Sequence, residues 1–129
     1  MDIFMLNIYQ EMLMNHYKNP THRGILAHYD IYAEQRNSSC GDEIICTATI
    51  DNTIITDIRF DGKGCVISQA TASLLSGRVI DMSLEYALSL DKKYLLDMIG
   101  IQLGPVRIQC ALLSLYALQK GINEYISER

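Results

Sequence analysis

The first part of the chain repeats its apolar residues with the period of a helix. Over residues 3–18 hydrophobic side chains recur at three- and four-residue spacing, at Met5, Ile8, Tyr9 and Met12. This spacing places them on one face of a helix, so we predict a helix over residues 3–18. Asn19-Pro20 ends it, because a residue that precedes proline is pushed out of the α region.

The middle of the chain changes to a strand pattern. Residues 43–50 alternate between apolar and polar side chains, and residues 54–60 are rich in Ile, Thr and Phe, which predicts two strands. Asp51-Asn52 between them suits a tight turn, so we expect an antiparallel hairpin. Residues 30–36 are predicted as a further strand, on a less regular pattern.

The second half of the chain returns to helical spacing. Residues 66–76 predict a helix with Gly77 as its C-cap. Ser83 and Asp91 are expected N-caps of two short helices. We expect the second of these helices to end at Gly100. Pro105 fits the first position of a last helix. The last helix has an apolar stripe of Ile108, Ala111, Leu112, Leu115, Leu118 and Ile122. A small antiparallel sheet covered on one face by helices is an α+β fold.

Composition narrows the class of protein. The 129 residues are enough for one domain, so we expect a single domain over residues 1–129. The formal net charge is -4 and Lys and Arg do not cluster, which argues against a nucleic-acid partner. No apolar run reaches the roughly 20 residues that cross a bilayer, so no membrane association is expected. The opening residues lack the basic region of a signal peptide, and we expect a cytoplasmic protein.

The chain has four cysteines, at positions 40, 46, 65 and 110. Thiols of cytosolic proteins stay reduced, and no Cys-x-x-Cys pair is present, so neither disulfides nor a thioredoxin-like redox centre is expected. Each cysteine is then a core residue, a metal ligand or a reactive thiol. Cys46 alternates with Ile44 and Ala48 on the apolar face of a predicted strand, so it is predicted to be a buried core residue.

Two cysteines lie beside glycines where loops join predicted elements. Cys40 and Asp42 flank Gly41 in a polar stretch, and a glycine there lets the backbone curl so that both side chains reach one site. Cys65 follows the turn Gly62-Lys63-Gly64 and stands at the start of a helix, where free N–H groups and the dipole favour a thiolate. Lys63 is expected to assist by its charge.

Cys110 lies in the early part of the last helix, where, taken alone, a core cysteine is the favoured interpretation. Cys40, Cys65 and Cys110 with Asp42 would nevertheless complete a tetrahedral site for zinc or iron, because thiolates prefer these metals. The three histidines have no cysteine spacing beside them and are predicted to be surface or packing residues: His16, His22 and His28.

These motifs, in this order, resemble the U-type iron–sulfur cluster assembly proteins, which include IscU, SufU and the N-terminal domain of NifU. The resemblance covers nearly the whole chain. It is carried by His16-Tyr17-x-Asn19-Pro20, Arg23-Gly24, Cys40-Gly41-Asp42, Gly62-Lys63-Gly64-Cys65, Ile67-Ser68-x-Ala70-Thr71-Ala72-Ser73 and the late Cys110.

The resemblance implies a three-stranded antiparallel sheet with helices and a scaffold or sulfur acceptor, not an enzyme in the ordinary sense. Its cysteines would accept sulfur from a cysteine desulfurase, hold iron or a transient [2Fe–2S] cluster, and bind Zn²⁺ in the resting form. Apo iron–sulfur proteins or downstream cluster carriers would receive the product. The resemblance assigns Cys40, Asp42, Cys65 and Cys110 as ligands, and the SufU branch suggests Cys40 as the sulfur acceptor.

The chain departs from both branches of the family. Gln109 stands where the IscU branch has a histidine, which leaves three thiolates and Asp42 as in the SufU branch. The segment from Gly77 to Gly104 is too short for the usual SufU insertion. Scaffold and zinc-dependent sulfur relay both stay open. A small zinc-stabilised binding domain without sulfur chemistry is the alternative class, while a zinc deaminase lacks its His-x-Glu and Cys-x-x-Cys motifs.

Overall fold

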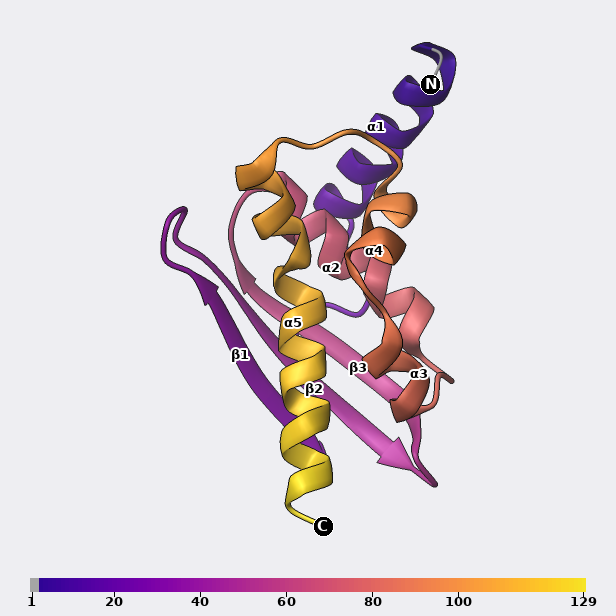
Figure 1. Ribbon diagram of the computed structural model, residues 1–129, viewed down its shortest axis with the longest axis vertical. Helices are drawn as coiled ribbons and strands as arrows, with labels where there is room; N and C mark the ends of the chain where they lie inside the picture. Colours follow the sequence, from indigo (N-terminus) through magenta and orange to yellow (C-terminus); the bar gives the residue numbers. More distant parts are fainter. Residues whose placement is uncertain (1–2) are drawn as a thin grey trace.

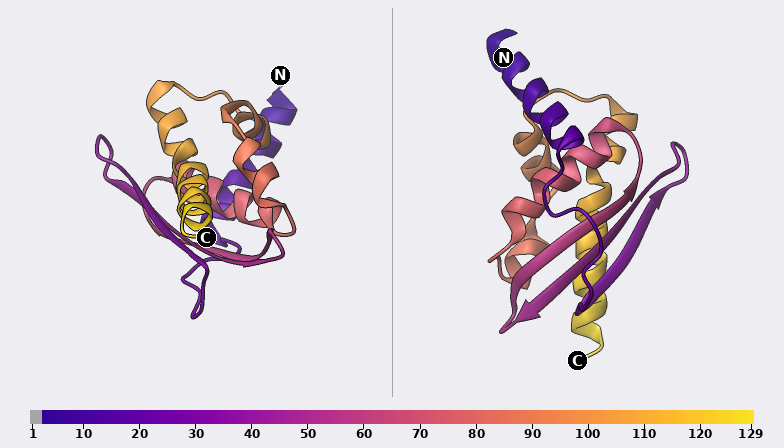
Figure 2. Two further views of the ribbon diagram at one scale, coloured as in Figure 1. Left: turned by 60° about the horizontal axis from the view of Figure 1, so that its bottom comes forward. Right: turned by 180° about the vertical axis from the view of Figure 1, so that it is seen from behind.

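The protein has a layer of three antiparallel strands, with helices on one face of it (Figure 1). The structure is a computed structural model and describes residues 3–129. Its elements are α1 (Ile3–Lys18), β1 (Ile31–Asn37), β2 (Asp42–Asp51), β3 (Ile54–Lys63), α2 (Val66–Val79), α3 (Leu84–Ser89), α4 (Lys92–Ile99) and α5 (Pro105–Ser127). Figure 2 shows the helices gathered on one side of the curved sheet. The predicted α+β fold is confirmed.

The sheet has the order β1-β2-β3, and its central strand positions the core. Cys46 on β2 lies opposite Ala33 of β1 and Phe60 of β3. Its side chain is fully buried, and it belongs to the hydrophobic core, as its alternation predicted. The less regular strand over 30–36 is also confirmed as β1, where the buried residues Ile31 and Ala33 alternate with exposed ones.

Two predicted turns differ in detail from the structure. Gly77 does not end α2, because the helix continues to Val79, whose buried side chain joins the core, and Ile80 is the C-cap. The hairpin turn lies one residue later than predicted. Asn52 and Thr53 both have positive φ, at 51° and 63°, which is the backbone that a two-residue hairpin loop requires.

The other boundary signals are confirmed. Ser83 Oγ accepts a hydrogen bond from the N–H of Tyr86, and Asp91 Oδ1 accepts one from the N–H of Tyr94. Helix α4 ends with Gly100 as its C-cap and α5 starts at Pro105, as the sequence indicates. These caps satisfy N–H groups that a helix cannot pair internally.

Helix α1 packs on α2, and α5 packs across β1, β2 and α2. The predicted helix over 3–18 is confirmed, but the apolar residues of its first turns are not a core face: Met5 and Ile8 are exposed, and Leu13 is buried instead. None of the helices within residues 3–129 combines the length and the apolar character that a membrane span needs.

Candidate metal and sulfur site

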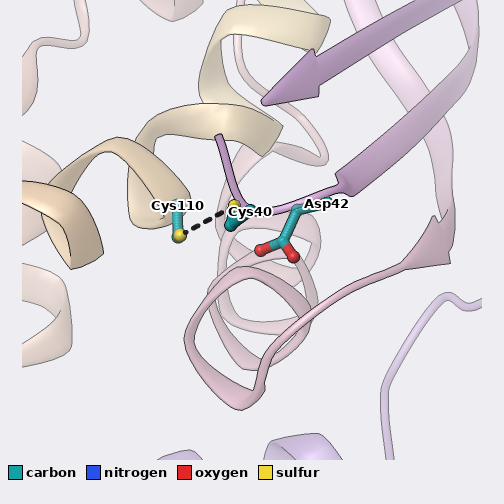
Figure 3. A group of neighbouring side chains, drawn as sticks. All are labelled: Cys40, Asp42 and Cys110. Atoms are coloured by element: carbon teal, nitrogen blue, oxygen red, sulfur yellow. Dashed lines mark hydrogen bonds between the residues drawn. The ribbon is translucent and has the colours of Figure 1, made fainter. Parts of the chain in front are cut away.

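Three of the four predicted site residues meet at one end of the sheet. Cys40 lies in the loop between β1 and β2, Asp42 is the first residue of β2, and Cys110 lies in the second turn of α5. One ligand atom from each lies within 4.8 Å of the other two. The sulfurs of Cys40 and Cys110 are 3.5 Å apart, and Figure 3 shows them facing each other beside the Asp42 carboxylate.

The β1–β2 loop curls as its glycine predicted. Gly41 has φ 74°, a backbone conformation that residues with a Cβ rarely adopt. The N–H of Gly41 donates to the carbonyl of Asn37, and the Asn37 side chain accepts from the N–H of Ser39. This folded loop places Cys40 over the N-terminal part of α5, with its side chain exposed.

Asp42 is only 3% exposed, and its two oxygens have different surroundings. Oδ1 accepts a hydrogen bond from the N–H of Cys65 at 3.3 Å, whereas Oδ2 has no hydrogen-bond partner among residues 3–129. Gly64 allows this approach, because a Cβ at that position would lie 2.6 Å from Asp42 Cγ. A buried oxygen without a donor is costly, unless a cation or other partner occupies its free side.

The charge of Asp42 is stabilised by its neighbours. Burial by itself raises the pKa of the carboxyl, but the Cys65 thiol, the Ser68 hydroxyl and the N–H of Cys65 outweigh burial and hold that pKa below its ordinary value. The carboxylate is therefore ionised at neutral pH. An ionised carboxylate with one unpaired oxygen beside thiols has the donor chemistry of a metal ligand.

Cys65 joins the site from the start of α2. It is the N-cap residue of that helix, and its thiol is exposed. Its sulfur lies 3.9 Å from Ser68 Oγ. Cys65 is not one of the three residues whose ligand atoms lie within 4.8 Å of one another, and it is linked to them through its N–H on Asp42. The Lys63 ammonium pairs with Glu43 at 3.5 Å, so its charge is directed at that carboxylate.

Cys110 is both a buried residue and a member of the site. It is 3% exposed, and its side chain points to Cys40. Burial raises the pKa of the Cys110 thiol, and so do the hydrogen bond with Cys40 and the nearby Cys65 and Asp42. Without a metal this thiol stays protonated at neutral pH. The interpretation as a core cysteine was incomplete, because it could not include a partner 70 residues away.

The remaining candidates lie elsewhere, as predicted. Burial raises the pKa of Cys46, whose sulfur belongs to the core. His16 and His22 face α2, where their Nδ1 atoms lie 2.7 Å from Ser73 Oγ and 3.1 Å from Ser76 Oγ. His28 is exposed. None of the three belongs to the metal-ligand group found within residues 3–129.

Sequence reasoning missed the polar residues that support the site. Ser68 and Gln69 are buried in the first turn of α2, and Arg23 contacts Gln69 and the end of β3. The available signal was a pair of polar side chains three and four residues after Cys65, at positions where an amphipathic helix would bury them. That signal names no partner, because Arg23 is more than 40 residues away in the chain.

A small α+β domain with three thiols and a carboxylate at one end of its sheet defines a class of metal- and sulfur-handling proteins. The family model described as the NifU-like N terminal domain matches residues 8–129, and the chain belongs to this family. The resemblance drawn from the sequence motifs is confirmed.

The chain is similar to several proteins named SufU or IscU. It is 37% identical to the zinc-dependent sulfurtransferase SufU of Bacillus subtilis, over 89% of this chain and 89% of that protein. It is 31% identical to the iron–sulfur cluster assembly scaffold protein IscU of Aquifex aeolicus, over 94% of this chain and 78% of that protein. The solved structure of FiSufU from Fervidobacterium islandicum AW-1 superposes with a TM-score of 0.74 at 26% identity, covering 90% of this chain and 97% of that one.

Proposed function

We propose that this protein takes part in iron–sulfur cluster assembly by accepting sulfur from a cysteine desulfurase on Cys40. Metal would be held by Cys40, Asp42, Cys65 and Cys110. The observation that carries the proposal is the meeting of Cys40, Asp42 and Cys110 within 4.8 Å, from the start of β2 and the start of α5. The relatives named SufU and IscU support both halves of the proposal.

The sulfur step is a thiol exchange. The Cys40 thiolate attacks the terminal sulfur of a persulfide on the desulfurase, a new S–S bond forms on Cys40, and the old S–S bond breaks. The desulfurase cysteine leaves as a thiolate, so no external oxidant or reductant is needed. The product is a persulfide on Cys40.

Exposure favours Cys40 as the acceptor over Cys110. Cys40 lies exposed on a loop, where a partner protein can reach its sulfur. Cys110 is buried, and its raised pKa keeps it protonated. Cys65 is exposed too, but its backbone is tied to Asp42 at the start of a helix. The loop thiol therefore has the best access and the fewest constraints.

The donor set of the site fits zinc. Soft thiolates with one carboxylate suit Zn²⁺, and the unpaired Oδ2 of Asp42 supplies an oxygen that faces no donor of residues 3–129. When bound, zinc would hold the thiols deprotonated. The chain's own contribution is the position of the donors: the β1–β2 loop presents Cys40, and α5 presents Cys110. Gln109, which stands where the IscU branch has a histidine, is exposed and is not counted among the donors.

A scaffold role uses the same donors for a different cargo. The similarity to IscU, named a cluster assembly scaffold, favours this second function. Iron and sulfide would be assembled on these residues into a [2Fe–2S] cluster, which is then passed to an apo iron–sulfur protein or a cluster carrier. Two exposed thiols, Cys40 and Cys65, make such a cargo accessible to the recipient.

Mass spectrometry after incubation with a cysteine desulfurase and cysteine tests the sulfur step. We expect the mass of one added sulfur on the peptide that contains Cys40. A Cys40→Ser variant should lose the label, and Cys46→Ala, which changes only the core, should keep it. Anaerobic addition of iron and sulfide then separates the two roles, since a transferable visible chromophore indicates a scaffold. Unlabelled wild-type protein would refute the sulfur-acceptor role.

A further inference from the structure

We propose that Arg23 is a positioning residue for Cys65, and that it acts by fixing the end of β3 and the first turn of α2, on either side of Cys65. This inference rests on the proposed role of Cys65 in the site. Arg23 lies in the segment between α1 and β1, far from the four site residues in sequence. Its guanidinium nevertheless makes three separate hydrogen bonds to the last residues of β3 and to the first turn of α2.

Hydrogen bonds of its two neighbours, His22 and Gly24, hold the backbone of Arg23 against β3. The N–H of Gly24 donates to the carbonyl of Phe60, and the N–H of Phe60 donates to the carbonyl of His22, each at 3.0 Å. These two bonds dock residues 22–24 along the outer side of β3, just before that strand ends at Lys63. The Arg23 side chain then extends toward the turn that carries Cys65.

The first branch of these contacts holds the end of β3, where Asp61 and Gly62 lie. Arg23 Nη2 donates to the carbonyl of Gly62 at 2.6 Å, and Nε donates to Asp61 Oδ1 at 2.9 Å. The same Asp61 oxygen accepts from the N–H of Gly62 at 2.9 Å. The guanidinium therefore fixes both the carbonyl and, through Asp61, the N–H of Gly62. Only two residues, Lys63 and Gly64, separate Gly62 from Cys65.

A second branch reaches Cys65 through buried side chains. Arg23 Nη1 donates to Gln69 Oε1 at 3.1 Å, which orients the Gln69 amide. The Gln69 amide nitrogen donates to Ser68 Oγ at 3.3 Å. Ser68 Oγ donates to the carbonyl of Cys65 at 3.2 Å and lies 3.9 Å from its sulfur.

Ser68 and Gln69 have almost no contact with water, so their hydrogen bonds depend on these partners. The three donors of Arg23 diverge toward three acceptors, which the fixed fork of a guanidinium can serve at once and a lysine cannot. Loss of Arg23 would leave the Gly62 carbonyl and the Gln69 amide to re-orient. Both of these groups hold the peptide segment on which Cys65 stands, so the thiol would lose its fixed position.

Arg23→Met tests the inference, because it keeps the apolar stem and removes every donor. Arg59→Met is the matched control, because Arg59 is also an arginine with hydrogen bonds to β3. Its partners are Asp57 and the Ile58 carbonyl, which lie before the end of that strand. In the metal-free protein we expect Cys65 to be alkylated faster relative to Cys40 in Arg23→Met. Zinc should pass to a chromophoric chelator about tenfold faster, the scale for lost supporting hydrogen bonds at a metal site.

Arg23→Lys should give intermediate values, and Arg59→Met should match the wild type. Alkylation ratios and zinc release that equal the wild type in Arg23→Met would overturn the inference, and so would an equal change in Arg59→Met. If Arg23→Met does not fold by circular dichroism, Arg23→Lys and Gln69→Leu decide in its place by the same two readouts. A wild-type protein that takes neither zinc nor sulfur would refute the proposed function, while the alkylation ratio would still test Arg23.

Discussion

The sulfurs of Cys40 and Cys110 lie 3.5 Å apart, although 70 residues separate them in the chain. The two sulfurs are therefore in contact. Cys65 lies near enough to contribute to the raised pKa of the Cys110 thiol. One of the two is exposed and the other is buried. The exposed thiol is therefore available to a partner while the buried one stays protected.

Mild oxidation of the metal-free protein should join Cys40 to Cys110. Diamide takes two electrons from a pair of thiols and leaves a disulfide, and the closest pair reacts with the least movement of the chain. Peptide mapping under non-reducing conditions should show this link ahead of any link to Cys65. Zinc added beforehand should protect both thiols. A first product that joins Cys65 to either residue would contradict the observed pairing.

Replacement of Asp42 by alanine should slow the release of metal or cluster. The carboxylate is a hard ligand among soft thiolates, so we expect it to be the ligand that exchanges. Without it the metal is held by thiolates alone, which exchange more slowly. The expected change is a lower rate of transfer to a chelator or an apo-acceptor. Asp42→Asn is the control that keeps an acceptor for the N–H of Cys65. Transfer at the wild-type rate in Asp42→Ala would remove Asp42 from the role of labile ligand.

Removal of metal by a chelator should leave the protein folded. The sheet, α2 and α5 form an extensive hydrophobic core, in which residues such as Leu75, Ile58 and Leu118 are fully buried. Zinc should raise the melting temperature, because a ligand that binds only the folded state stabilises it. Circular dichroism melts with and without chelator measure both effects. Unfolding on chelation, with no sulfur uptake, would instead favour a zinc-stabilised binding domain.

His16 should make the protein less stable as the pH falls through the ordinary range for histidine. Burial lowers the pKa of His16, so between the lowered value and 6.5 the unfolded chain binds more protons than the folded one. Stability is then complete above 6.5, declines as the pH drops below it, and levels off under the folded-state pKa. The N–H of Thr21 donates to Ser73 Oγ, which leaves the Ser73 hydroxyl proton for Nδ1 of a neutral His16.

Urea unfolding at about pH 7.5 and about pH 5.5 measures this loss. His16→Gln should lose less stability between the two conditions than the wild type, and His28→Gln, changed at an exposed position, should behave like the wild type. Equal losses in wild type and His16→Gln would show that His16 does not contribute to the pH dependence.

Local patterns predicted most elements of the fold, because each depends on residues close in sequence. The alternation around Cys46 predicted a core strand, and the Ser83 and Asp91 side chains predicted helix starts. The predicted C-cap at Gly77 was wrong. A glycine tolerates an exposed helical position, and α2 continues past it to the buried Val79. The hairpin turn lies one residue later than predicted because Asp51 still pairs with Ile54, which leaves Asn52 and Thr53 as the loop.

The sequence by itself determined the α+β class and made Cys40, Asp42 and Cys65 candidates, since glycines and loop junctions mark them locally. Tertiary structure decided what Cys110 does: its helical stripe suits a core residue equally well, and only the packing of α5 across β1 and β2 brings its sulfur to Cys40. The same holds for Arg23, whose partners come from β3 and α2. Contacts between distant residues depend on how whole elements pack, and a pattern along the chain does not contain that packing.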